Sequence, residues 1–328
     1  MRVLVALGGN AMTAPDGGAR QQDQVAAITR AMESVADLVA AGADVAVTHG
    51  NGPQVGNLLA KNELAAATLP AVTLDWCGAQ TQGTIGFSVL NALDDALRAR
   101  GVARRTAAVV TRTLVRGDDP GFANPTKPVG GYLPESRARE LIGRGQSWRD
   151  CGPLGWRRVV PSPDPVEVID APAVSALADA GFVVVSGGGG GIPVVRDGGR
   201  LRGVEAVIDK DLAAALLART LGADVLVIAT DVEHAVLGYG TPDARPLGTV
   251  TVSELRRHAE EGHFAGGSMG PKVEATCRFV EGGGTRAVIT SLGHITHAAR
   301  GAAVGTIVVP DQVVSVVPDQ VVSTGGRD

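Results

Sequence analysis

Residues 182–191 read FVVVSGGGGG, a short apolar run that passes directly into five consecutive glycines. Phe182 to Val185 are aromatic or β-branched, which is typical of a strand buried on both faces of a parallel sheet. Gly187 to Gly191 cannot pack a core, but they let a ligand approach the backbone N–H groups closely. At the C-terminal end of a buried strand such amides bind anions in α/β folds. The alternative is a flexible loop.

Two earlier segments repeat this pattern. Residues 3–7 (VLVAL) run into Gly8, Gly9 and Asn10, and residues 45–48 (VAVT) run into the turn HGNGPQ at 49–54. The carboxyl ends of parallel strands meet at one edge of a sheet. The three turns therefore predict one crevice that binds a ligand with several negatively charged oxygens.

Composition narrows the class of protein. The chain has 328 residues, of which 45% are hydrophobic and 20% charged, enough for a large core in one long or two ordinary domains. A net charge of −4 gives no reason to expect nucleic acid or an anionic membrane as a partner. No apolar run approaches the roughly 20 residues of a membrane span, and a strand begins almost at Met1, leaving no room for a signal peptide. Widely spaced Cys77, Cys151 and Cys277 predict a reducing cytoplasm and no metal cluster.

Lysine is rare, at four of the 30 basic residues. Lys61 lies in a polar helical segment and is expected at the surface. The others lie in loop-like motifs, NPTKP at 124–128, DKD at 209–211 and GSMGPK at 267–272. A compact ammonium on a flexible stem differs from arginine in what it can bind. Each lysine alone is best interpreted as a surface residue, but the three settings together favour a functional set.

The rest of the chain alternates between helical periodicity and short apolar strands. This alternation predicts an α/β fold, a three-layer αβα sandwich with a mainly parallel central sheet. Residues 196–200 (RDGGR) predict a hairpin turn. Helices are expected at 21–41, 55–66, 74–100 (one or two), 171–180, 210–221, 253–261 and 270–281, and strands at 44–48, 106–115, 159–160, 182–185, 224–229, 286–290 and 306–309.

Residues 117–157 interrupt the alternation with many prolines and glycines. Trp148 and Trp156 need a surface to pack on, so the stretch is expected to be a folded subdomain that protrudes from the sheet. It carries Lys127. It is either a lid that brings this cation onto the site or a dimer contact or flap.

The C-terminal tail contains a tandem repeat. The octapeptide VVPDQVVS at 308–315 recurs at 316–323. One copy is expected to complete the last edge strand and a hairpin. The second is either a duplication without a needed role or an exposed β-prone segment that pairs with another chain. We therefore predict one domain over 1–310 and a tail over 311–328.

Six motifs together resemble the carbamate kinases of the amino acid kinase fold. The match runs in order from residue 3 to about 309, and the combination is far more specific than any one glycine motif. The motifs are GGNA at 8–11, HGNGPQVG at 49–56, NPTKP at 124–128, GGGGIPV at 188–194, EAVIDKDL at 205–212 and GSMGPKV at 267–273.

The resemblance implies the reaction ATP + carbamate ⇌ ADP + carbamoyl phosphate, run toward ATP at the end of arginine or other nitrogen-compound breakdown. Members of that family are cytoplasmic homodimers that need Mg²⁺. In that fold the N-terminal half holds the phosphoryl acceptor and the C-terminal half, here 182–310, holds the nucleotide. The segment at 117–157 resembles the family's protruding subdomain.

The resemblance and phosphoryl-transfer chemistry together assign roles. Lys127, Lys210 and Lys272 would neutralise phosphate charge, with Asp211 orienting the lysines. Mg²⁺ would bridge phosphate oxygens with few protein ligands, so no metal ligand is assigned. The transferring phosphoryl and carbamate would bind Gly8, Gly9, Asn10, His49, Gly50, Asn51 and Gly52, and the nucleotide would bind Gly188, Gly189, Asp209, Thr230, Asp231, Tyr239, Met269 and Gly270.

Some features of the sequence allow more than one interpretation. Many kinases of the wider fold have lysine where Asn10 stands, and we expect Lys127 to supply that charge. His49 could act as a base, but carbamate is already anionic, so a hydrogen-bonding role is preferred. The polar segment 80–83 (QTQG) faces the crevice or forms an ordinary polar helix face. The other five histidines have no predicted partners. Alternative functions are a kinase for a phosphonate or acylamino acid and a nucleotide-binding regulatory module.

Overall fold

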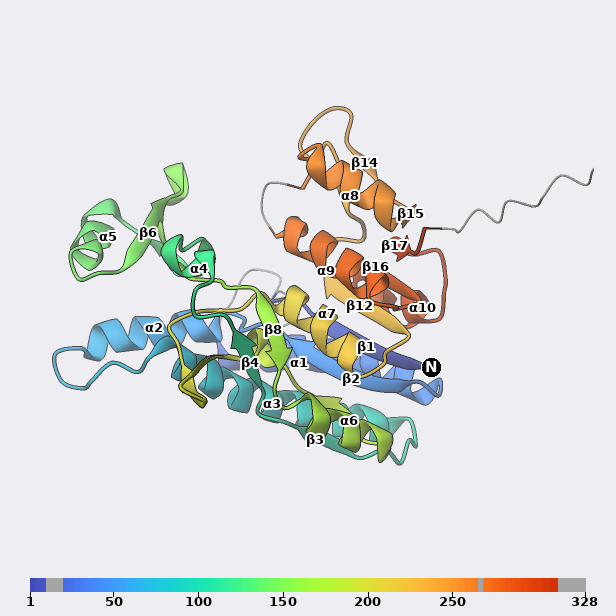
Figure 1. Ribbon diagram of the computed structural model, residues 1–328. Helices are drawn as coiled ribbons and strands as arrows, with labels where there is room; N and C mark the ends of the chain where they lie inside the picture. Colours follow the sequence, from blue (N-terminus) through green and yellow to red (C-terminus); the bar gives the residue numbers. More distant parts are fainter. Residues whose placement is uncertain (10–19, 265–267, 312–328) are drawn as a thin grey trace, which may run out of the picture.

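The computed structural model describes residues 1–9, 20–264 and 268–311 (Figure 1). Asn10, Gly267 and the repeated octapeptide beyond Asp311 lie outside the described residues. The main sheet has eight strands in the order β15-β17-β16-β12-β1-β2-β9-β3. Their bounds are β1 Arg2–Leu7, β2 Asp44–His49, β3 Thr106–Ala108, β9 Val183–Val185, β12 Val225–Thr230, β15 Thr249–Thr251, β16 Arg286–Ser291 and β17 Thr306–Val309.

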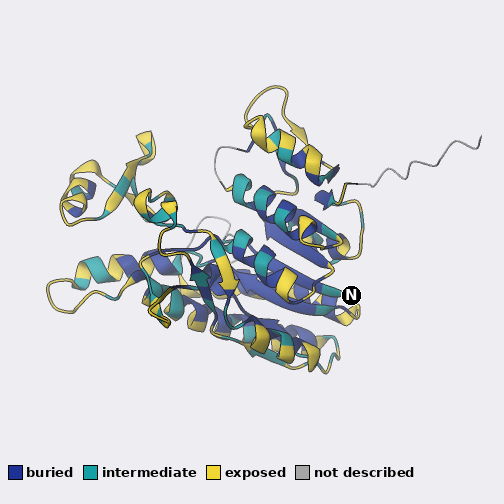
Figure 2. Cartoon of the chain, in the orientation of Figure 1, coloured by how far each residue is buried: buried dark blue, intermediate teal, exposed yellow. Residues whose placement is uncertain are grey.

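Helices cover both faces of this sheet because the side chains of its central strands alternate between two cores. Leu4 of β1 packs in a core with α6, α7, α8 and α9, and Val5 packs in a second core with α1, α3 and α10. Figure 2 shows the sheet as the most completely buried part of the chain. The predicted three-layer sandwich is confirmed. The helices are α1 Gln21–Ala40, α2 Gln54–Ala65, α3 Leu74–Ala99, α6 Ala171–Asp179, α7 Lys210–Thr220, α8 Val252–Glu260, α9 Met269–Glu281 and α10 Ile295–Ala299.

The single strand predicted at 106–115 is wrong. Its first part, β3, ends the main sheet, whereas β4 (Arg112–Val115) joins a four-stranded sheet, β11-β10-β4-β8. The Gln82 amide explains the break, since it accepts from the Thr111 N–H at 2.9 Å and donates to the Thr111 carbonyl at 3.0 Å. The Gln82 side chain thus forms hydrogen bonds with the backbone N–H and carbonyl of Thr111, at the point where the chain leaves the main sheet. The other strands are β8 Pro165–Val168, β10 Ile192–Asp197 and β11 Arg200–Gly203, and β10 and β11 form the predicted hairpin.

The predicted protruding subdomain is a three-stranded antiparallel sheet with two short α-helices. Figure 1 shows α5 and β6 standing clear of the main body. Arg139 of α5 lies over the Trp156 ring at 5.7 Å, which gives that aromatic residue its packing partner. Residues 159–160 were expected to resume the main fold, but they pair with β5 and still belong to the subdomain. Its elements are α4 Pro120–Ala123, β5 Lys127–Leu133, α5 Glu135–Ile142, β6 Ser147–Asp150 and β7 Trp156–Val160.

The end of the described chain also differs from expectation. β17 was predicted to be the last edge strand, but it pairs with β16 on one side and β15 on the other. The edge is therefore β15, a three-residue strand too short to be recognised by pattern. A two-stranded ribbon of β13 (Val236–Leu237) and β14 (Arg245–Pro246) precedes it. Among the described helices, none is both long and apolar enough to cross a membrane.

Candidate active site

The three glycine turns lie together, as predicted. Strands β12, β1, β2 and β9 are consecutive in the sheet and parallel, so they end at one edge. The Gly8 N–H donates to the Ala229 carbonyl at 2.8 Å, which joins the turn after β1 to β12. A Cβ on Gly50 would lie 3.3 Å from Cδ of Lys210 and 3.6 Å from the Gly9 nitrogen. Glycine at position 50 thus lets a lysine stem and a second turn approach the backbone.

The glycine run after β9 is packed more tightly than expected. Gly187 donates its N–H to the Thr111 hydroxyl, and Gly190 and Gly191 donate theirs to carbonyls within the run. The prediction that these amides are open to a ligand is therefore wrong for three of the five. Gly188 and Gly189 are buried, and a Cβ on either would collide with the side chain of His49 or Asn51. The run brings the turn after β2 against the turn after β9.

The polar segment in α3 supports these turns. Thr81 and Gln82 are both buried. The Thr81 hydroxyl donates to Oδ1 of Asn51 at 2.9 Å, and the Gln82 amide donates to the Gly188 carbonyl at 2.9 Å. Of the predicted segment 80–83, Thr81 and Gln82 face the crevice, whereas Gln80 and Gly83 are exposed. The sequence signal was a hydroxyl and an amide side chain in an otherwise apolar helix. Such groups need hydrogen-bond partners when the helix is buried.

A buried ion cluster lies where α7 and α9 begin. Lys272 Nζ lies 3.1 Å from Oδ2 of Asp211, and Lys210 pairs with the other oxygen of the same carboxylate. Burial alone would raise the pKa of Asp211, but the two ammonium groups lower it below its usual value. Burial lowers the pKa of Lys210, with Asp211 opposing and Lys272 adding to that shift. One carboxylate thus holds two cations that repel each other.

The third lysine, Lys127, belongs to the protruding subdomain and lies beside the start of α7. Lys127 begins β5 and pairs with Oδ2 of Asp209. Oδ1 of Asp209 caps α7 by accepting from the N–H groups of Asp211 at 2.9 Å and Leu212 at 3.4 Å. The structure therefore brings Lys127 beside the Lys210 helix within one chain, as a lid would. Both Asp209 oxygens are used in this way, although the sequence had assigned Asp209 to the nucleotide.

His49 is buried between the turns, and its Nδ1 donates to the Gly50 carbonyl at 2.8 Å. Burial lowers its pKa to about 4, with the nearby Lys210 charge in the same direction and the Gly50 bond opposing. The imidazole is therefore neutral at pH 7. Neutral His49 with its proton on Nδ1 fits the predicted hydrogen-bonding role better than that of a base.

The remaining candidates are spread along the C-terminal half. Thr230 ends β12 at the same edge as the turns, and its hydroxyl donates to Asp231 at 2.9 Å. Tyr239, in the β13–β14 loop, is 82% exposed. Met269 and Gly270 form the first turn of α9, beside Lys272. Of the other predicted residues, Gly52 has φ +53° in the turn after β2, Lys61 is exposed as expected, and Asn10 is outside the described residues.

The amino acid kinase family model matches residues 1–291. This chain belongs to the amino acid kinase family. Within it, the chain is 48% identical to the carbamate kinase of Thermococcus kodakarensis and 45% identical to that of Pyrococcus furiosus, over 94% of this chain and 99% of each relative. A structure of carbamate kinase from Giardia lamblia bound to AMP-PNP superimposes with a TM-score of 0.88 at 40% identity, covering 94% of this chain and 98% of that one. The resemblance to carbamate kinases and the assignment as a phosphotransferase are confirmed.

Proposed function

We propose that this amino acid kinase family member is a carbamate kinase, which transfers a phosphoryl group between ATP and carbamate. The observation that supports it most is the buried Lys210–Asp211–Lys272 cluster at the edge where the glycine turns meet. Phosphoryl transfer requires cationic groups beside a backbone that the phosphates can approach closely, and glycine turns permit that approach. The choice of carbamate follows from the carbamate kinases that the chain resembles over 94% of its length.

In the proposed mechanism, a carbamate oxygen attacks the γ-phosphorus of ATP and the bond to the ADP oxygen breaks. Charge spreads over the three equatorial oxygens in a loose transition state, so the protein mainly positions and neutralises. Lys210 and Lys272 neutralise the moving group and the nucleotide phosphates. Asp211 fixes both ammonium groups before the substrate arrives, so little reorganisation is needed during transfer.

The acceptor side uses neutral donors. The amides of Gly9 and Asn51 and the side chain of Asn10 bind the carbamate and the transferring group. Gly8, Gly50 and Gly52 shape the turns, since the N–H groups of Gly8 and Gly50 already donate to the carbonyls of Ala229 and Leu7. Carbamate is an anion, so its oxygen needs no base. His49 orients the turn through its bond to the Gly50 carbonyl. Lys127 follows the subdomain as it closes over the substrates.

Mg²⁺ would bind together with the nucleotide and neutralise phosphate charge. Because Asp209 and Asp211 are paired with lysines, we expect the phosphate oxygens to be the main ligands of Mg²⁺. The half of the chain that binds the nucleotide spans 182–310. The residues that contact the nucleotide there are Thr230, Asp231, Tyr239, Met269 and Gly270. We further propose a cytoplasmic homodimer that works toward ATP synthesis in the breakdown of arginine or a related nitrogen compound.

The test is ATP formation from ADP and carbamoyl phosphate with Mg²⁺, against a no-enzyme control because carbamoyl phosphate is unstable. The proposal predicts rapid ATP formation that depends on the enzyme. If folded, ADP-binding protein forms no ATP, the carbamate assignment is wrong. A screen of small acids with ATP, including phosphonates and acylamino acids, then identifies a kinase for another acceptor, and no turnover with any acid indicates a nucleotide-binding module.

A further inference from the structure

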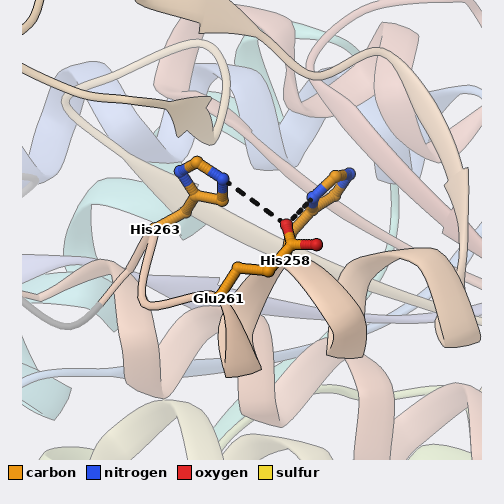
Figure 3. Close-up of side chains that lie close together, drawn as sticks. All are labelled: His258, Glu261 and His263. Atoms are coloured by element: carbon orange, nitrogen blue, oxygen red, sulfur yellow. Dashed lines mark hydrogen bonds and ion pairs between the residues drawn. The ribbon is translucent and has the colours of Figure 1, made fainter.

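Two histidines and a glutamate converge at the C-terminal end of α8, outside the lysine cluster (Figure 3). Oε2 of Glu261 lies 3.0 Å from Nδ1 of His258 and 3.6 Å from Nε2 of His263. The three atoms lie within 4.8 Å of one another. The rings of His258 and His263 pack edge to face, with their centroids 5.7 Å apart.

The end of the helix creates this convergence. Gly262 has φ +85° and donates its N–H to the Ala259 carbonyl, while the His263 N–H donates to the His258 carbonyl. These two bonds form a Schellman motif, which places the residue after the glycine over the residue five positions earlier. That pair is usually hydrophobic, but here both members are histidine. The sequence HAEEGH at 258–263 therefore encodes the arrangement.

We propose that His258, Glu261 and His263 bind a divalent transition metal, with Zn²⁺ as the best fit. Zn–N and Zn–O bonds of about 2.0–2.2 Å place tetrahedral ligand atoms roughly 3.3 Å apart. The two separations from the Glu261 oxygen, 3.0 and 3.6 Å, bracket that value. Two imidazoles and one carboxylate favour Zn²⁺ over Mg²⁺ or Ca²⁺, which prefer oxygen ligands. The negative end of the α8 dipole also favours a cation there.

Arg257 and Gly238 contact two of the proposed ligands, and the contact of Gly238 must change when a metal binds. The Arg257 guanidinium lies 3.9 Å from the other Glu261 oxygen, so Oε2 still faces the two histidines. The Gly238 N–H donates to Nδ1 of His263 at 3.2 Å, which puts the proton of neutral His263 on Nε2, facing Glu261. When a metal takes Nε2, that proton moves to Nδ1. The Gly238 bond is then lost, and the loop that carries Tyr239 is released from His263.

Zinc binding is measured by calorimetry on full-length protein freed of metal by chelator. We expect one Zn²⁺ per chain, and affinity 10–100-fold weaker in His258→Gln and in His263→Gln. The matched control is His294→Gln. His294 also lies near a carboxylate, Glu233 at 3.4 Å, but among the described residues it belongs to no group of three possible metal ligands. The titration is repeated in Cys151→Ser, since Cys151 is a partly exposed thiol.

The outcomes distinguish a built site from incidental binding. Unchanged affinity in His294→Gln and Cys151→Ser, together with loss in both site variants, supports the proposal. Substoichiometric binding, or equal affinity in wild type and the double variant His258→Gln/His263→Gln, overturns it. Amide hydrogen exchange at Gly238 gives a readout independent of affinity. We expect it to become faster with Zn²⁺ in wild type, and an unchanged rate in a zinc-saturated protein contradicts the predicted binding at His263 Nε2.

Discussion

Two clusters in this chain each join one carboxylate to two nitrogen-bearing side chains, but in opposite surroundings. Asp211 lies between Lys210 and Lys272 and is almost fully buried, whereas Glu261 lies between His258 and His263 with about half of its side chain exposed. The buried carboxylate must stay ionised because two cations depend on it. The exposed one is screened by water, so its pairs contribute little to stability. Burial therefore decides which cluster is coupled to folding.

The largest effect on stability is expected for Asp211→Asn. This change leaves two buried ammonium groups without a counter-ion, so we expect the free energy of unfolding to fall by about 3–5 kcal/mol. Denaturant titration measures it. Asp118→Asn, which breaks a fully exposed pair with Arg116, is the control and should leave the midpoint unchanged. Equal shifts in the two variants would show that burial of Asp211 does not increase its contribution to stability.

His49 extends the comparison to pH. Its pKa is about 4 in the folded chain and 6.5 in the unfolded chain, so the unfolded state takes up a proton first as pH falls. The contribution of neutral His49 is complete above pH 6.5 and is lost progressively toward pH 4, by on the order of 3 kcal/mol. The difference in unfolding free energy between wild type and His49→Gln should follow this window. A pH-independent difference would mean that His49 is not buried in its neutral form.

Lys127 lies between the two extremes, since its side chain is 30% exposed and paired with nearly buried Asp209. We expect Lys127→Ala to lower the rate of ATP formation on the order of 10²-fold, because a charge that closes over the phosphates is lost. The free energy of unfolding should fall less in this variant than in Asp211→Asn, because Lys127 is partly exposed and Asp209 keeps its hydrogen bonds to the start of α7. Lys61→Ala removes an exposed lysine and serves as the control. A rate equal to that of Lys61→Ala would favour the dimer-contact or flap interpretation of the subdomain.

The smallest effect is expected for Glu261→Gln in metal-free protein. Glu261 is exposed to water, which screens its pairs with the histidines, so the thermal midpoint should stay at the wild-type value. Differential scanning calorimetry in the presence of a chelator measures this. A clear drop in the midpoint would show that the cluster stabilises the end of α8. The Asp211 and Glu261 clusters would then differ less in their contributions to stability.

The sequence predicted the features that depend on local chemistry. Strands rich in β-branched residues followed by glycine turns identified the edge of the sheet, and the scarcity of lysine singled out Lys210 and Lys272, which lie on one carboxylate. Contacts between distant segments could not be predicted. No local signal indicates that Gln82 divides the strand at 106–115. The amides of Gly187, Gly190 and Gly191 likewise find partners only in the folded chain.

The histidine cluster was missed for a related reason. The spacing of His258, Glu261 and His263 can be read from the sequence, but it has meaning only if Glu261 caps the end of a helix and Gly262 adopts a positive φ. The predicted helix at 253–261 ended at that position, so the signal was present. Pairing the residues on either side of the helix end would have identified it.

The central claim is that the buried lysine cluster neutralises the transferring phosphoryl group. Its most direct test is the rate of ATP formation from ADP and carbamoyl phosphate for Lys272→Ala and Lys61→Ala, each with folding verified by circular dichroism. The account predicts a rate lower by on the order of 10²–10⁴-fold in Lys272→Ala and unchanged in Lys61→Ala. A folded Lys272→Ala enzyme that works at the wild-type rate would contradict it.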